Sequence, residues 1–140
     1  VQNVYNYKES DFFDEIKKIE KKGIDIILDY IGGDYINKNI NLLKSDGKLI
    51  NIGFLNGSQV NINLMKIMLK RLTITGSTLR IRDKTYKAKI LNDLKKIVFP
   101  NFENGKIKCY IDSVFKLKDV VSSHKYLEDG GHIGKIVLEI

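Results

Sequence analysis

Three glycine-containing loops, each placed directly after an apolar run, constrain the fold of this chain more than any other feature. They lie at residues 28–35 (LDYIGGDY), 51–57 (NIGFLNG) and 75–83 (TGSTLRIRD). In an open parallel sheet the carboxyl ends of the strands face one crevice, so loops that follow successive strands form a single ligand-binding edge. The sequence therefore predicts an α/β fold whose site is built from strand ends.

The spacing of the apolar residues predicts strands that alternate with helices, which implies a parallel sheet. The first helix follows a cap at Ser10 or Asp11 and ends at Gly23, and the β-branched strand after it is typical of a strand covered on both faces. Pro100 should end the long helix near Phe99. The expected elements are a strand-like segment at 1–7, strands at 24–28, 48–54 and 72–76, within 107–117 and at 135–140, and helices at 34–46 (capped by Asp34, closed by Asp46 and Gly47), 63–70, 84–98 and 119–127.

The composition favours one folded domain without a membrane span. Of the 140 residues, 43% are hydrophobic, and no apolar run approaches the roughly 20 residues that a span requires. The net charge of +7 could favour nucleic acid, anionic lipid or a phosphorylated cofactor as a partner, and the charge distribution argues against the first two. No aromatic residues alternate with the basic ones, and Lys17, Lys18, Lys21 and Lys22 are expected in the last turn of a helix, where they complement its dipole. The single Cys109 cannot form an internal disulfide, so we expect a reducing, cytoplasmic compartment.

Small residues at the three strand ends are the main candidates for ligand binding. Gly32 and Gly33 alone would satisfy the needs of a tight strand-to-helix turn. Together with Gly53 and Ser77 they would let a flat ring and its ribose approach the backbone, which a purely structural sheet does not need. Ser77 and Thr78 by themselves are equally compatible with a helix-capping loop. The combination favours a nucleotide site.

Other site chemistries find little support in the sequence. The segment GGHIGK (130–135) lacks the spacing and the Ser or Thr of a phosphate-binding loop, which argues against nucleotide hydrolysis. His124, His132 and Cys109 lack the spacing of a zinc site, and no serine lies in a nucleophile-elbow sequence. Tyr7 is compatible either with an edge aromatic or with a surface on which an adenine stacks.

The chain resembles the C-terminal part of the quinone oxidoreductases of the medium-chain dehydrogenase/reductase superfamily, especially the NADPH-dependent group related to the p53-inducible quinone oxidoreductase. The resemblance covers essentially the whole chain. It implies a partial Rossmann-type doubly wound parallel sheet in residues 1–104, followed by a segment, 105–140, that returns to a catalytic domain. The segments that match are NYKESDF (6–12), DIILDYIGGDY (25–35), NLLKSDGKLINIG (41–53), KRLTITGSTLRIRDKTYK (70–87), IDSVFKL (111–117) and HKYLEDGGHIGKIVLEI (124–140).

For function, the resemblance implies an NADPH-dependent, zinc-independent reductase that passes a hydride to a quinone or a related electrophilic carbonyl compound. The protein would mainly orient the reactants and exclude water, and no side chain stands out as a general acid, so no catalytic residue is assigned. The residues that match the family's cofactor contacts are Tyr7 at the adenosine end, Tyr30, Ile31, Gly32, Gly53, Phe54, Leu55, Ser77, Thr78 and Leu79 around the nicotinamide half, and Gly134 and Lys135 near the C-terminus.

The resemblance also implies structural neighbours that are not in this sequence. In the strand order 3-2-1-4-5-6 the chain would supply strands 3 to 6, so the glycine-rich phosphate loop and the determinants of NADPH preference would precede Val1. Strand 24–28 would then have an unpaired edge, and we expect it to pair with another copy or to belong to a longer polypeptide.

The family's quaternary structure implies a homodimer through strand 72–76, and the alternation of Leu72 and Ile74 with threonines is compatible with an edge strand. We expect a small quinone-like substrate as partner, with neither nucleic acid nor membrane. The alternatives are a catalytically silent nucleotide-binding module and, with less support, a basic nucleic-acid-binding protein.

Overall fold

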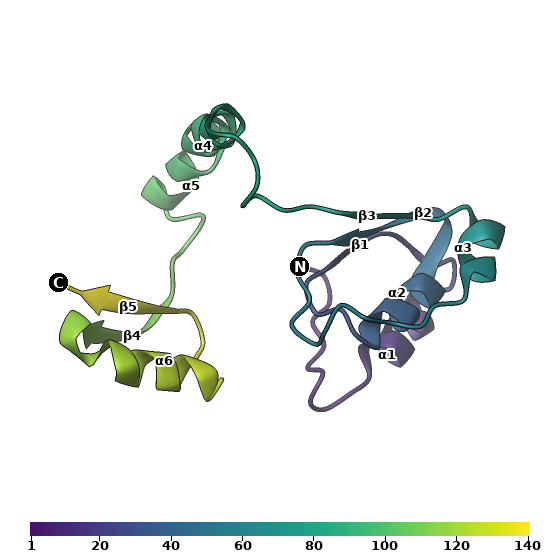
Figure 1. Ribbon diagram of the computed structural model, residues 1–140, viewed down its shortest axis with the longest axis horizontal. Coiled ribbons are helices and arrows are strands. Elements are labelled where there is room, and N and C mark those ends of the chain that lie inside the picture. Colours follow the sequence, from purple (N-terminus) through teal and green to yellow (C-terminus); the bar gives the residue numbers. More distant parts are fainter. The chain divides into compact units, whose positions relative to one another are not determined.

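The computed structural model describes all 140 residues, which divide into two compact units, Val1–Ile81 and Arg82–Ile140 (Figure 1). Each unit combines parallel strands with helices, so the α/β class expected from the sequence is confirmed. The boundary that the resemblance implies at residue 104 concerns function and stays a prediction. No helix of the chain has the length and apolar character needed to cross a membrane.

The first unit is a three-stranded parallel sheet with three helices. The strand order is β1-β2-β3, which corresponds to strands 4, 5 and 6 of the expected doubly wound sheet. Strand β3 is confirmed as an edge strand, because it pairs with β2 alone. The elements are α1 (Phe12–Ile19), β1 (Ile24–Asp29), α2 (Tyr35–Leu42), β2 (Leu43–Asn51), α3 (Leu64–Lys70) and β3 (Thr73–Gly76).

The register of the three strands places their ends on one line. Asp29 of β1 lies opposite Asn51 of β2, and Asn51 lies opposite Gly76 of β3. The three glycine-containing loops therefore leave the sheet side by side, as the sequence predicts.

The core of the first unit lies between the sheet and the helices. Ile36 and Ile40 of α2 pack with Leu43 and Leu49 of β2, and Leu49 is fully buried. Burial of such side chains is the main favourable contribution to folding, at about 1.5–3 kcal/mol each. The partly buried side chains around them are Ile27, Val60, Ile62, Ile67 and Leu72.

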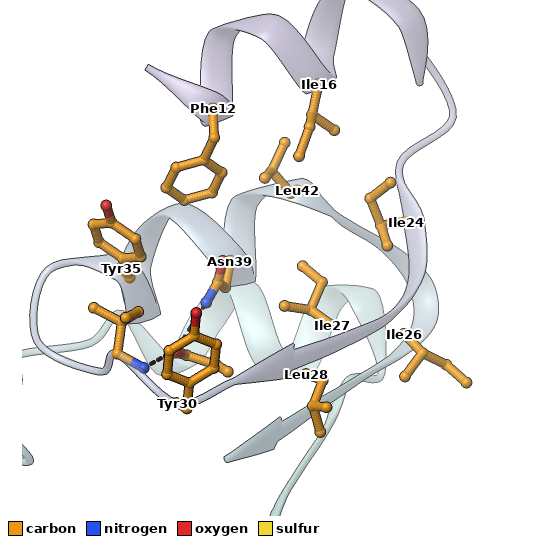
Figure 2. Close-up of a pocket in the computed structure, with 12 residues that line it drawn as sticks. Phe12, Ile16, Ile24, Ile26, Ile27, Leu28, Tyr30, Tyr35, Asn39 and Leu42 are labelled. Atoms are coloured by element: carbon orange, nitrogen blue, oxygen red, sulfur yellow. Dashed lines mark hydrogen bonds between the residues drawn. The ribbon is translucent and has the colours of Figure 1, made fainter. Parts of the chain in front are cut away.

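Strand β1 is covered on one face only, so the prediction of a strand buried on both faces is wrong for this chain. Ile27 points toward α1 and α2, whereas Ile26 and Leu28 point to the opposite side (Figure 2) and are 58% and 60% exposed. Because the first unit places no helix over that side of β1, it leaves these apolar side chains uncovered. β1 pairs with β2 alone, so its other edge is unpaired, as expected.

The N-terminal elements differ from the prediction at their ends. Residues 1–7 form no strand, because no other strand of the chain lies beside them to complete a ladder. Asp11 caps α1 by accepting a hydrogen bond from the Phe13 N–H at 2.9 Å, but the helix ends at Ile19 rather than at Gly23. Lys21 and Lys22 therefore lie beyond the helix and not in its last turn.

The end of α2 also differs from the prediction. Strand β2 begins at Leu43, directly after the helix, and Asp46 lies inside the strand with φ of 63° instead of closing the helix. Asp34 makes no side-chain capping bond. The Lys70 ammonium group stabilises this abrupt end, since it donates to the carbonyl oxygens of Ile40, Asn41 and Leu43 at 3.2, 2.9 and 2.7 Å.

The second unit contains a helical segment and a two-stranded parallel sheet. The long helix α4 (Lys84–Ile97) ends near Phe99, as predicted, but Pro100 does not end the helical region. It opens a new helix that begins at Phe99, because proline is well tolerated in a first turn, where its missing N–H would have no partner. The elements are α4 (Lys84–Ile97), α5 (Phe99–Glu103), β4 (Ile111–Lys116), a 3₁₀ turn (Leu117–Asp119), α6 (Val120–Glu128) and β5 (Lys135–Glu139).

A carboxylate joins three parts of the second unit. Asp112 of β4 accepts hydrogen bonds from the Ile133 N–H at 2.8 Å, the Tyr126 hydroxyl at 2.9 Å and the Ser113 hydroxyl at 3.1 Å. These donors, the Ile133 N–H foremost, hold the pKa of Asp112 below its ordinary value. The strand, α6 and the loop before β5 are thus tied to one side chain.

Candidate functional site

The three loops at the carboxyl edge of the first sheet are bonded to one another. The first loop follows β1, the second follows β2 and the third follows β3. Such main-chain bonds hold the loops as one surface and satisfy backbone groups that would otherwise need water. In each of these bonds the N–H of the first residue donates to the carbonyl oxygen of the second: Ile52 to Asp29 (2.8 Å), Leu55 to Tyr30 (3.2 Å), Asn56 to Ile31 (2.7 Å), Gly33 to Gly57 (2.9 Å) and Ser77 to Asn51 (2.9 Å).

A buried carboxylate, Asp29, lies beneath the first loop and is 4% exposed. Its Oδ1 accepts hydrogen bonds from the Ile31 and Gly32 N–H groups at 2.7 and 3.1 Å. Its Oδ2 accepts from Asn39 Nδ2 at 3.0 Å, and a longer bond of 3.5 Å comes from Asn51 Nδ2. Four N–H groups thus replace the water that a carboxylate requires when it leaves solvent. The carbonyl oxygen of Asn51 also accepts a hydrogen bond from the Ser77 N–H. Through Asn51, Asp29 is therefore linked to all three loops.

Gly32 is required by the shape of the first loop. Its φ is 71°, and a Cβ built there would come within 2.6 Å of the Gly57 carbonyl oxygen and 2.7 Å of Phe54 Cδ1. Gly33 is similar, with φ of 53° and the Asn56 carbonyl oxygen at 2.5 Å from a built Cβ. The tight turn therefore accounts for both glycines. The absence of side chains at these two positions also lets the first loop pack closely against the second.

A hollow of about 670 Å³ lies beside these loops, which is within the size range of cofactor sites. Four of the residues expected to contact a cofactor line it: Tyr7, Tyr30, Ile31 and Leu55. Its other lining residues are Tyr5, Phe12, Tyr35 and Asn56, which the sequence did not single out.

The wall of this hollow is aromatic, with one cation beside it. The rings of Phe12 and Tyr35 have their centroids 4.9 Å apart. The Lys38 ammonium lies 5.6 Å and 5.9 Å from the centroids of these rings and 2.6 Å from the carboxylate of Asp11. Its hydrogen bond lowers the pKa of Asp11. The two rings are tilted by 43°, and their exposed faces offer surfaces on which a flat heterocycle can pack.

A smaller, mostly apolar hollow of about 360 Å³ adjoins the unpaired edge of β1. Figure 2 shows Phe12 and Ile16 of α1 above it, with Tyr35 and Asn39 of α2 to one side and Tyr30 at the end of the strand. The two hollows adjoin each other, since both are lined by Phe12, Tyr30, Ile31 and Tyr35.

The remaining expected contacts fall into two groups. Gly53 and Phe54 lie in the second loop. The third loop, directly after β3, contains Ser77, Thr78 and Leu79, and the Ser77 N–H donates to the Asn51 carbonyl oxygen. Gly134 and Lys135 belong to the second unit, where they line a hollow of about 320 Å³ together with His124 and His132. The role of all these residues in cofactor binding stays a prediction.

The chain does not present the ligands of a zinc site. No group of three or more His, Cys, Asp or Glu side chains comes together in a way that could hold a metal ion. Cys109 is exposed, and both histidines lie in the second unit.

The sequence analysis missed Asp29, Asn39 and Asn51 as parts of the site. A signal was present for Asp29, since an aspartate at the end of an apolar strand and three residues before a glycine is suited to accept bonds from the turn that follows. No local pattern connects Asn39 or Asn51 to it, because they meet Asp29 only through helix packing and strand register.

Comparison with known proteins identifies one family and several relatives that match nearly the whole chain. A family profile described as zinc-binding dehydrogenase matches residues 1–138. A synaptic vesicle membrane protein VAT-1 homolog of Danio rerio is 28% identical over 154 residues, covering 99% of this chain and 31% of the relative. A quinone oxidoreductase of Homo sapiens is 31% identical over 137 residues, covering 96% of this chain and 40% of the relative.

A solved structure shows the same fold. A protein described as an NADPH:quinone reductase from Bacillus thuringiensis superimposes with a TM-score of 0.78 at 19% identity, over 97% of this chain and 42% of that one. The chain thus spans 31% and 40% of the length of the two curated relatives named above.

Proposed function

Since the chain belongs to the zinc-binding dehydrogenase family, we propose that it is the nicotinamide-binding part of an NADPH-dependent reductase that acts on quinones or related electrophilic carbonyl compounds. The main support is the set of hydrogen-bonded loops at the carboxyl ends of β1, β2 and β3, beside an aromatic hollow. This is the edge at which doubly wound sheets bind their ligands. The names of a human relative and of a similar solved structure point to the same acceptor class.

In this proposal the residues of the chain bind and orient rather than react. The first and second loops hold the nicotinamide ring, with Ile31 of the first loop and Leu55 of the second lining the hollow. Tyr7, Tyr30 and Leu55 exclude water from the side of the hollow. A bound NADPH would supply the hydride, and the reduced quinone would take its proton from solvent, so no acidic side chain is needed.

A charge placed in the hollow tests this proposal. Leu55 lines the hollow and is 80% exposed, so Leu55→Asp should leave the fold intact. The new carboxylate would lie beside the bound nucleotide, and its repulsion of the phosphates should weaken NADPH binding about tenfold or more. Isothermal titration of the protein with NADPH measures this change.

The matched control is Leu64→Asp on α3, since Leu64 is 67% exposed and lies outside the hollow. This variant should bind NADPH as the original chain does. Equal losses in the two variants, or unchanged binding in Leu55→Asp, would contradict the assigned site. The same titrations with NADH measure the cofactor preference.

The hollow contains no carboxylic acid or histidine, which also favours a second candidate, a nucleotide-binding module without catalytic activity. Both candidates bind NADPH, but only the reductase oxidises it. Mixing the protein with NADPH and a simple benzoquinone, and following absorbance at the nicotinamide band, separates them. Binding without turnover would favour the silent module.

We also propose that β3 forms the contact of a homodimer. β3 is an edge strand, and all four of its residues are exposed. Ile74 is 39% exposed, and Ile74→Lys should shift the protein toward monomer in sedimentation, because charged side chains on an edge oppose strand pairing. Ile107→Lys is the control, since Ile107 is also 39% exposed but lies in the second unit. A dimer that persists in Ile74→Lys would exclude β3 as the interface.

A further inference from the structure

A second hollow of the first unit, with a volume of about 250 Å³, lies where the strands begin. It is bounded by the end of α1, the junction of α2 with β2 and the last residue of α3. It is thus at the opposite end of the sheet from the three loops. Its charged lining residues are Lys17, Lys21, Lys22, Lys44, Lys70 and Glu20.

Most of the positive charge in this hollow has no acidic partner. Lys44 pairs with Asp25, whereas Lys17, Lys21 and Lys22 take part in none of the ion pairs of the chain. The ammonium group of Lys17 instead lies 4.3 Å from the centroid of the Phe13 ring. The single carboxylate of the lining, Glu20, leaves an excess of cations.

The excess of positive charge also affects Lys70. Its ammonium group donates to three carbonyl oxygens at the end of α2, which fixes it in the floor of the hollow. Burial lowers the pKa of Lys70, and repulsion from Lys66 and Lys17 lowers it further. An anion in the hollow would relieve this repulsion.

The helix dipole explains only part of the cluster. Lys17 lies in the last turn of α1 and complements the negative end of the helix. Lys21 and Lys22 follow the helix, which ends at Ile19, and the dipole effect fades within the last turn. Their positions on the wall of the hollow therefore need another explanation.

We propose that this hollow binds a small anion that carries a phosphate monoester or a pyrophosphate group. Lysine ammonium groups bind phosphate as point charges, and several lysines that line one hollow favour a multiply charged anion over a carboxylate. The Ser45 hydroxyl also lines the hollow and is a neutral donor for such an oxygen. This site is independent of the proposed cofactor site, because the two lie at opposite ends of the strands.

The test compares two pairs of adjacent lysines in the 140-residue chain. Lys21→Gln with Lys22→Gln removes two charges from the hollow, and Lys95→Gln with Lys96→Gln removes two from the last turn of α4 in the other unit. Isothermal titration with inorganic pyrophosphate should show at least about tenfold weaker binding for the first pair, as expected for the loss of charge-assisted contacts, and no change for the second. Amide NMR shifts on binding should centre on Gly23 and Ser45.

A parallel titration with vesicles that contain phosphatidic acid identifies the source of the phosphate. Binding to pyrophosphate that only the first pair of substitutions weakens supports a soluble ligand. Binding to the vesicles alone, with the same dependence, supports a lipid headgroup. An equal loss of affinity in the two double variants would show general charge attraction and would overturn the proposal. The proposal would also be overturned if the chain bound neither pyrophosphate nor the vesicles.

Discussion

Asp29→Ala is expected to destabilise the first unit by about 3–5 kcal/mol, because it leaves several N–H donors without an acceptor inside the protein. The carboxylate of Asp29 is the acceptor for the Ile31 and Gly32 N–H groups and for the Asn39 amide, and the substitution leaves these buried donors unpaired. Each buried donor without a partner costs about 1–3 kcal/mol. The loop that Asp29 holds should also lose its defined position.

Hydrogen exchange of residues 24–51 as a function of urea measures this effect in the first unit by itself. Asp34→Ala is the matched control, because Asp34 is exposed and its side chain makes no capping bond. Its effect should stay within about 0.5 kcal/mol. Similar stabilities for the two variants would show that the bonds of Asp29 contribute nothing net to folding.

Asp29→Asn separates the charge of the side chain from its position. An asparagine keeps one acceptor oxygen for the Ile31 and Gly32 N–H groups, but its amide nitrogen faces the Asn39 amide, donor against donor. We expect an intermediate loss of about 1–2 kcal/mol. NADPH affinity should fall in the same order as stability if the loop forms the cofactor site.

The sequence was sufficient to predict the parallel sheet and most of its helices, since these depend on local apolar spacing. The long helix α4 and strand β3 lie within one or two residues of their predicted positions. The predicted ends of elements are wrong where residues far away in the sequence determine where a helix or strand stops. Lys70 stabilises the end of α2 from 30 residues away, so no local stop signal marked it.

The same distinction applies to the candidate site. The glycine loops could be predicted because a strand end followed by glycines has a local pattern, and the register of Asp29 with Asn51 confirms that they share an edge. The link from Asp29 to Asn39 could not be predicted, because it forms only when α2 packs on the sheet. Residues 1–7 were expected to form a strand, but a strand needs a partner that the rest of this chain does not provide.

Gly32→Ala should cost about 3 kcal/mol, because it combines a backbone penalty with a steric one. At φ of 71° an L-residue loses about 1–2 kcal/mol, and the added methyl group would lie 2.6 Å from the Gly57 carbonyl oxygen. That oxygen accepts the Gly33 N–H and cannot move without breaking the bond between the first two loops. Both the stability of the first unit and its NADPH affinity should therefore fall.

Two other glycines separate these contributions. Gly57 has φ of 91° but open space around a built Cβ, so Gly57→Ala should show the backbone penalty alone, at about 1–2 kcal/mol. Gly131 has no such φ and no neighbour within 4 Å, so Gly131→Ala should change stability by less than about 0.5 kcal/mol. Equal losses for Gly32→Ala and Gly57→Ala, measured by hydrogen exchange in urea, would mean that the loops relax around the new methyl group. A larger loss at Gly32 would instead show that contact between the first two loops, and not turn geometry alone, requires glycine at this position.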